Sequence, residues 1–91
     1  MAATEKAYEA MINALKDYNT KVSRACEEMI SAGNTCVANT DGDPAASSAN
    51  AKLQSSVGHI FETLSQANRI VSAMQEELQE IQRAAALASS I

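Results

Sequence analysis

The sequence has no tryptophan, one phenylalanine, two tyrosines, one proline and three glycines in 91 residues. Strands and tight turns depend on aromatic, β-branched and turn-forming residues, so this scarcity argues against a β-fold. Alanine, glutamine, glutamate and serine are abundant, and all but serine are strong helix formers. The length allows one domain at most. We therefore predict an all-α protein with a single domain over residues 1–91.

Other absences exclude classes of function. Seven Lys and Arg stand against eleven Asp and Glu, for a net charge of −4, which gives no electrostatic reason to expect nucleic acid or an anionic membrane surface. No apolar run approaches the roughly 18–20 residues that a membrane-spanning helix needs. The first residues lack the basic start and apolar block of a signal peptide. We expect a cytoplasmic protein, or one secreted without a cleaved signal peptide, with no nucleic acid partner and no membrane insertion.

The residues that carry catalysis or bind metals are also few. His59 is the only histidine, and the sequence offers no Ser-His-Asp or Cys-His arrangement around it. Asp41-Gly42-Asp43 resembles a fragment of a calcium loop, but the remaining ligands and the closing Glu are missing. We therefore predict no enzyme activity, no catalytic residues, no metal site and no cofactor.

Two segments repeat apolar residues in alternating steps of three and four. The first repeat comprises Tyr8, Met11, Leu15, Tyr18, Val22, Ala25, Met29, Ala32 and Cys36. The second comprises Leu53, Val57, Ile60, Leu64, Ala67, Val71, Met74, Leu78, Ile81, Ala85 and Ala88. Such a repeat predicts two helices that pack side by side along a common seam. The predicted seam includes Tyr18, Val22, Leu64, Ala67 and Val71.

The segment between the two repeats has the residues of a turn. Gly42 adopts a left-handed conformation at little cost, Asp43 is a good helix cap, and Pro44 suits a first helical position. With Asp41, these residues predict a helix over residues 4–38, a turn over 39–44 and a second helix over 44–88. The short connection makes the helices antiparallel neighbours.

The end of the first helix has an alternative. Gly33-Asn34 is a second candidate stop, so the helix ends at Gly33 or at Ala38. The apolar repeat continues through this point to Cys36, which favours Ala38. Folding the chain about the turn then sets Tyr18 opposite Ala67.

A hairpin by itself leaves apolar residues uncovered. Residues beside the seam widen the apolar stripe beyond what one neighbouring helix covers. The second helix also extends past the first, so its last apolar residues have no neighbour within the chain. We expect two hairpins to associate as a homodimer, forming a four-helix bundle. The predicted partner interface comprises Ile12, Ile30, Phe61, Ile70, Ile81 and Ala85.

The two cysteines lie ten residues apart on the predicted first helix. Cys26 and Cys36 are then separated by about 15 Å along the helix axis, whereas a disulfide tolerates about 7 Å between Cα atoms. They cannot pair with each other within a continuous helix. Buried free thiols and a disulfide between subunits are the remaining alternatives.

A chain of this length that folds as two antiparallel helices around a central turn resembles the WXG family of small bacterial proteins exported by type VII secretion. Asp41-Gly42-Asp43-Pro44 stands where that family has Trp-x-Gly. The family's export signal, an aromatic residue followed four positions later by an acid, is not matched, because Phe61 is followed by Ser65. The resemblance implies a divergent member that dimerises, or that binds the helical amino-terminal domain of a larger effector toxin as a targeting chaperone.

Two other classes of helical protein fit the same pattern. Type III secretion needle subunits are helical hairpins with a proline-containing turn, and Asp43-Pro44 lies in a matching place. A generic coiled-coil adaptor is the second alternative. Formation of filaments on concentration would favour the needle-like structural subunit.

Overall fold

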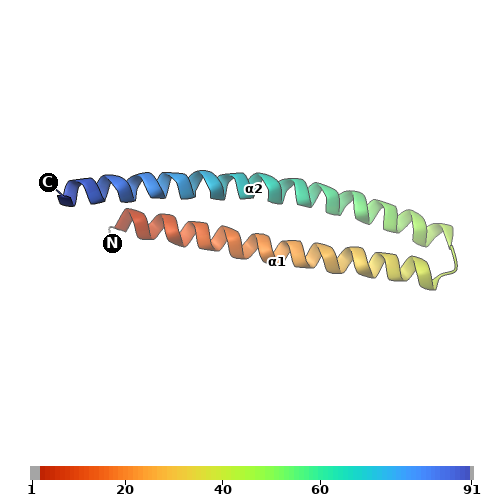
Figure 1. Cartoon of the computed structure of the whole chain (residues 1–91). Helices are drawn as coiled ribbons and strands as arrows, with labels where there is room; N and C mark the ends of the chain where they lie inside the picture. The colour runs from red at the N-terminus through yellow and green to blue at the C-terminus, as the bar shows by residue number, and fades with distance from the viewer. Residues whose placement is uncertain (1–2, 91) are drawn as a thin grey trace. The chain divides into compact units, whose positions relative to one another are not determined.

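The computed structural model describes residues 3–90 and consists of two helices. Helix α1 spans Ala3–Asn39 and helix α2 spans Pro44–Ser90, with 37 and 47 residues. A short turn joins them (Figure 1). No strand occurs in residues 3–90. The predicted all-α helical hairpin is confirmed.

The turn has the capping residues that the sequence predicts. Gly42 is left-handed with φ 78°, and Asp41 precedes it with φ 48°. The Ala45 amide donates to Asp43 Oδ1 at 3.3 Å, which caps the start of α2. At the end of α1, Thr40 Oγ1 donates to the Cys36 carbonyl at 2.9 Å. Helix α1 runs without a break through Gly33, so the alternative stop there is not used.

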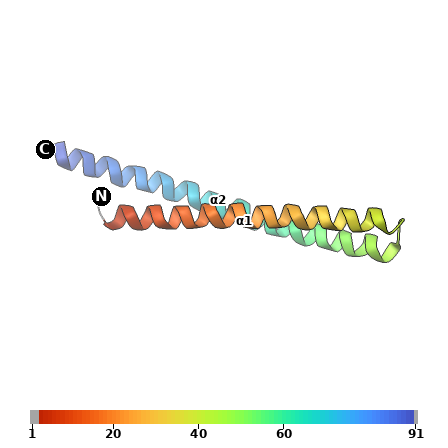
Figure 2. The same ribbon diagram turned by 90° about the horizontal axis from the view of Figure 1, so that it is seen from below.

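The packing divides into two compact units, each joining part of α1 to part of α2. The first unit is made of the residues up to Asn19 and from Gln66 onward, and the second of Thr20–Ser65. The second unit contains the turn. Its α1 and α2 segments lie side by side in both Figure 1 and Figure 2.

The core of the second unit is formed by small and aliphatic side chains. Cys26 and Val57 are the most buried, at 0% and 1% exposure, and Leu64 is buried with them. Half-buried side chains complete this core: Val22, Ile30, Val37, Leu53 and Ile60. At its edge, Asn34 Oδ1 accepts hydrogen bonds from Asn50 Nδ2 at 3.1 Å and from Gln54 Nε2 at 3.0 Å.

Gly33 allows the two helices of the second unit to approach closely. A Cβ atom at this position would overlap Asn50 Oδ1 and would lie 3.0 Å from Leu53 Cδ2. The absence of a side chain at Gly33 therefore provides the space that Asn50 and Leu53 occupy.

The first unit buries both apolar and polar side chains. Ile12 and Val71 are buried, and so are Glu5 and Asn19. Asn19 Nδ2 donates to Asn68 Oδ1 at 2.7 Å, which gives the buried amide a partner on the other helix. The hydrogen bond recovers part of the free energy that burying an amide costs.

The contact face of α1 differs from the predicted seam. Tyr18, predicted in the seam, is 62% exposed, while its neighbour Asn19 is buried. Val22 is half-buried, and on α2 Leu64 and Val71 are buried and Ala67 is half-buried. The buried face of α1 is therefore rotated about the helix axis by part of a turn from the predicted face.

The rotation has a physical reason in the pattern of α1. Three neighbouring columns of mostly apolar residues run along this helix at seven-residue intervals. The first column is Met11, Tyr18, Ala25 and Ala32; the middle column is Tyr8, Leu15, Val22, Met29 and Cys36; the third column is Ile12, Asn19, Cys26 and Gly33. Because the third column contains the polar Asn19 and Gly33, it does not stand out as an apolar repeat in the sequence. The structure packs that third column against α2 and leaves the first one exposed.

Replacing Leu64 with Ala tests the second unit's core. We expect Leu64→Ala to lower the free energy of unfolding by about 2–5 kcal/mol, because the leucine is 7% exposed and its removal leaves a cavity. Leu87→Ala is the matched control on α2, since Leu87 is 67% exposed, and should change stability by less than about 0.5 kcal/mol. Urea denaturation followed by circular dichroism measures both. Equal effects at the two leucines would contradict this core.

Two helical glycines test the close approach. Gly58 lies within α2, and a Cβ there meets no described atom within 4 Å, so Gly58→Ala should stabilise by about 1 kcal/mol through helix propensity. Gly33→Ala gains the same helix propensity, but its new Cβ atom must displace the side chains of Asn50 and Leu53. We expect its net change to be zero or unfavourable, as judged from urea midpoints. A gain equal to that of Gly58→Ala would show that the contact tolerates a methyl group.

Candidate interaction surface

Helix α1 carries an uncovered apolar face that we call the open stripe. It lies in the first unit and is formed by Met11 and Tyr18, which are 52% and 62% exposed. Residues seven apart fall on nearly the same side of a helix with 3.6 residues per turn. The open stripe is therefore the part of the first column that α2 leaves uncovered in this unit.

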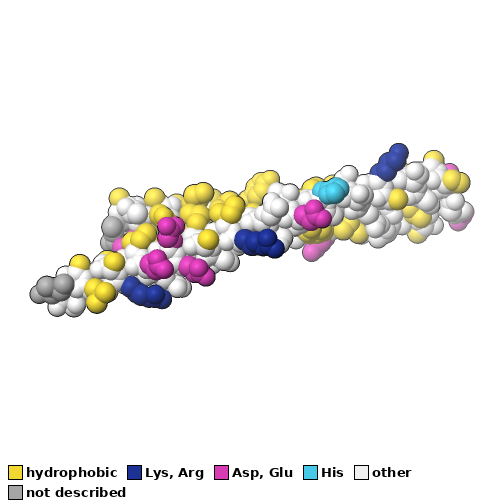
Figure 3. All heavy atoms as spheres, turned by 90° about the horizontal axis from the view of Figure 1, so that it is seen from above, with side chains coloured by type: hydrophobic (Ala, Val, Ile, Leu, Met, Phe, Trp, Pro, Cys, Tyr) yellow, Lys and Arg dark blue, Asp and Glu magenta, His cyan; other side chains and the backbone are white. Residues whose placement is uncertain are grey.

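Helix α2 adds two large apolar side chains to the surface. Phe61 is 36% exposed in the second unit, and Ile70 is 52% exposed in the first. Phe61 directly follows Ile60, and Ile70 directly precedes Val71. Ile60 and Val71 both belong to the face of α2 that packs against α1. At roughly 100° per residue, Phe61 and Ile70 fall on opposite flanks of α2's buried face. Figure 3 shows hydrophobic side chains standing on the surface beside charges of both signs.

The structure separates the residues that we predicted for the partner interface. Ile12 is buried against α2 in the first unit, and Ile30 is half-buried in the second, so both pack within the hairpin. Phe61 and Ile70 are exposed. Ile81 is half-buried and Ala85 is exposed. Ile12 is buried where we predicted it on the surface, and Met11 and Tyr18 are exposed where we predicted them in the seam. Both differences follow from the rotation of α1.

A sequence signal for this rotation exists. The face of α1 that packs on α2 has aliphatic residues on its far edge, at Ile30 and Val37, in the column next to the third one. Asn19 also has a possible partner, Asn68, on the opposite helix. Searching for complementary polar pairs across the hairpin would have placed Asn19 in the contact.

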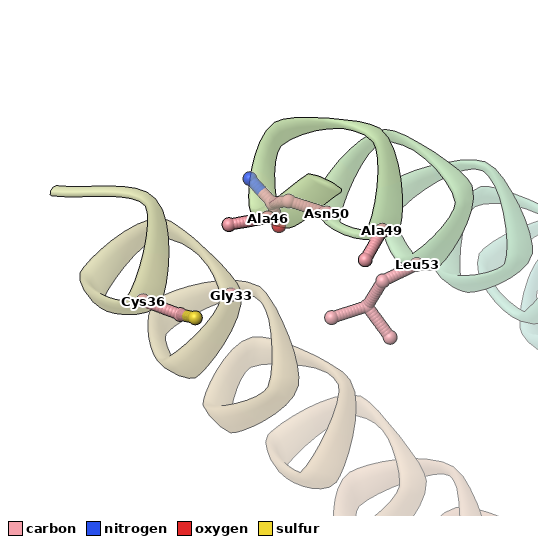
Figure 4. A pocket seen from close by; sticks show the side chains of 6 residues that line it. All are labelled: Gly33, Cys36, Ala46, Ala49, Asn50 and Leu53. Carbon is pink, nitrogen blue, oxygen red and sulfur yellow. The ribbon is translucent and has the colours of Figure 1, made fainter. Parts of the chain in front are cut away.

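The two thiols have different environments. Cys26 is buried and Cys36 is exposed, and both are free. The prediction of a buried thiol at Cys36 is therefore wrong. Cys36 borders an open apolar hollow of about 140 Å³ in the second unit (Figure 4). The remaining lining residues are Gly33, Ala46, Ala49, Asn50 and Leu53.

The hollow is small for a ligand site. Pockets that bind small molecules are usually about 300–1,000 Å³. Most of its lining side chains are small, and its polar contribution comes from Asn50. Its size suits a single apolar side chain of another helix.

Chemically reactive groups are dispersed. Within residues 3–90, no group of three or more His, Cys, Asp or Glu side chains is placed to hold a metal ion. His59 Nδ1 lies 3.7 Å from Glu62 Oε2 one helical turn away, and both side chains are more than three-quarters exposed. In the described part of the chain, neither helix has a stretch that is long and apolar enough to cross a membrane.

Comparison with known proteins does not assign a family. The chain matches no family model, no curated protein and no solved structure. The proposed function is therefore based on the geometry of the hairpin and its open stripe.

The pKa of one ionisable group in the first unit, Tyr8, differs from its ordinary value. Tyr8 Oη donates to Glu77 Oε2 at 3.2 Å. This hydrogen bond, the negative charge of Glu77 and partial desolvation raise the pKa of Tyr8 above its ordinary value of 10.0. The neutral phenol is the form that donates, so the stabilisation is present below pH 10 and is lost as the pH rises past the pKa of the folded state.

Titration of the tyrosine absorbance tests this contact. In a Tyr18→Phe background, where Tyr8 is the remaining tyrosine, we expect Glu77→Gln to lower the pKa of Tyr8, because it removes both the charge and a strong acceptor. Glu76→Gln is the control, as a neighbouring carboxylate that is not hydrogen-bonded to Tyr8. An equal shift from both variants would mean that the pKa responds to net charge and that the hydrogen bond is not formed.

Proposed function

We propose that the protein is a non-enzymatic interaction module that binds a helix of another polypeptide along the open stripe. The observation that carries the proposal is the exposure of Met11 and Tyr18, large apolar side chains on the same column of α1, after α2 has packed. Helices whose apolar band is wider than one neighbour covers usually pack against two. Binding of a helix through regularly spaced apolar residues is a common mode of recognition.

The resemblance to the WXG family supports a finer proposal. In that reading, the chain is a bacterial type VII secretion protein, either a substrate or a targeting chaperone, and its partner is the helical amino-terminal domain of a larger secreted toxin. The two long helices and the central turn support this proposal. The protein would act in the cytoplasm, or leave the cell without a cleaved signal peptide.

The proposed binding surface favours a helical partner over an extended peptide. The hairpin has no strand edge within residues 3–90 to which a peptide could add. The stripe repeats every seven residues, which is the spacing at which another helix presents its own side chains. The aromatic Tyr18 is the best anchor, because aromatic residues are enriched among those that dominate binding energy.

Where a large protein with a helical amino-terminal domain is encoded beside this chain, binding to that domain tests the proposal. We expect a complex of the two purified proteins in calorimetry, and Tyr18→Glu should weaken it at least 100-fold by placing a carboxylate in an apolar contact. Asn13→Glu is the matched control, because Asn13 is exposed on α1 but lies away from the stripe.

Three outcomes would contradict the proposal in different ways. Unchanged affinity of Tyr18→Glu would remove the stripe from the binding site. Filaments formed by the chain alone on concentration would support a needle-like structural subunit instead. Absence of both self-association and binding to the helical domain would remove the interaction module altogether.

A further inference from the structure

Ile70 of α2 borders the open stripe within the first unit. It lies seven residues before Glu77, so the two side chains share one side of α2. Tyr8 Oη donates to Glu77 Oε2 at 3.2 Å across the two helices. Around α1, Tyr8 lies between the buried Ile12 and the exposed Met11, at about 60° from Met11. The side of α2 that carries Ile70 therefore lies next to the open stripe.

The open stripe and Ile70 together form a surface that we call the apolar flank. Its three members are large and well exposed: Met11 at 52%, Tyr18 at 62% and Ile70 at 52%. All three belong to the first unit. The apolar flank is therefore a single surface with contributions from both helices.

Two carboxylates border the apolar flank. Glu77 is in the column of Ile70, and Glu80 follows three residues later, further round toward the solvent; both side chains are exposed. The hydrogen bond from Tyr8 is made to one oxygen of Glu77, Oε2, and it holds that carboxylate at the edge of the flank. The apolar flank thus has a negatively charged edge on α2.

The basic residues of the first unit lie elsewhere. Among its described residues, the Lys and Arg side chains are roughly 100–140° around their own helix from Met11 or Ile70: Lys6, Lys16, Arg69 and Arg83. The charges at the edge of the apolar flank are therefore of one sign.

We propose that the occupant of the apolar flank is a cationic amphipathic helix of another polypeptide. Its apolar residues cover Met11, Tyr18 and Ile70, and its lysine or arginine side chains follow one edge and pair with Glu77 and Glu80. The inference rests on the proposed function and names the chemistry of the partner.

The spacing of the two carboxylates suits a helical partner. Glu77 and Glu80 are three residues apart, which is about 4.5 Å along α2 at 1.5 Å per residue. Basic residues three or four apart on a partner helix are neighbours on its surface at a similar distance. The ring of Tyr18 adds to the preference, because an arginine guanidinium stacks favourably on an exposed aromatic face.

A second copy of this chain is a poorer occupant than a basic helix. It has the same net charge of −4, and its own apolar flank is bordered by the same two carboxylates. Like charges brought together at an interface cost free energy and disfavour the wrong partner. A helix with a basic edge has the opposite charge and meets no such repulsion.

Two synthetic helical peptides that differ only in charge test the inference. Both have leucine in alternating steps of three and four residues, with lysine along the edges of one peptide and glutamate along those of the other. We expect the lysine peptide to bind the full chain at least 10-fold more tightly in calorimetry, with a difference that shrinks as salt is added. Tyr18→Ala should weaken its binding at least 5-fold, because the apolar contact is reduced.

Charge reversal separates the edge of the apolar flank from the net charge of the protein. We expect Glu77→Lys/Glu80→Lys to reverse the preference, so that the glutamate peptide binds more tightly. Glu27→Lys/Glu28→Lys is the matched control, since it makes the same change in net charge at exposed positions of the second unit. Its preference for the lysine peptide should stay within about 3-fold of that of the unaltered chain.

One further variant keeps the inference testable if the double reversal fails to fold by circular dichroism. Glu80→Lys leaves the hydrogen bond between Tyr8 and Glu77 in place and should lower the preference for the lysine peptide by about 2- to 5-fold. An unchanged preference in this variant would overturn the pairing with Glu80.

The other outcomes separate the inference from the proposed function. Equal binding of both peptides that is lost in Tyr18→Ala overturns the cationic partner and leaves the proposed function standing. An equal reversal by Glu27→Lys/Glu28→Lys also overturns the inference, because net charge then decides the preference. Self-association that depends on Tyr18 and excludes both peptides would identify a second copy as the occupant. Binding of neither peptide overturns the inference as well, and the proposed function is then decided by binding to the helical domain.

Discussion

The apolar band on α1 is wider than one neighbouring helix can cover, and the other features of the protein follow from this constraint. Helix α2 covers the third column, with Ile12 and Cys26, and part of the middle column, with Leu15 and Val22. The first column, with Met11 and Tyr18, stays in contact with water. A band of this width is typical of helices with more than one neighbour. The hairpin therefore forms a complete fold but leaves part of its apolar surface exposed.

The choice of columns depends on a few small and polar residues. Gly33 lets α1 approach α2 closely, and Cys26 fills the contact with a small apolar side chain. Asn19 meets Asn68 at 2.7 Å, a pairing that a rotated helix would lose. Buried polar pairs of this kind stabilise less than apolar contacts but fix the register of two helices. The hydrogen bond thus favours the register in which Met11 and Tyr18 are left open.

The sequence predicts the helices and the turn because these depend on local chemistry. Gly42, Asp43 and Pro44 determine their own backbone and caps, and the apolar repeat of α2 is single and unambiguous. The register of α1 could not be predicted in the same way, because three columns compete and the difference lies in contacts with residues far along the chain. The apolar repeat predicts Tyr18 in the seam, whereas the polar Asn19 breaks the repeat when α1 is considered without its neighbour.

The two units also differ in how far apart their contacts are along the chain. Asn34 and Asn50 are 16 residues apart, whereas Tyr8 and Glu77 are 69 apart. Closing a short loop costs less conformational entropy than closing a long one, and local contacts form faster. Contacts beside the turn therefore have the lower loop-closure cost, and we expect the second unit to form first when the chain folds. The first unit, where Asn19 and Tyr8 make their polar contacts, is then expected to form last and to open first.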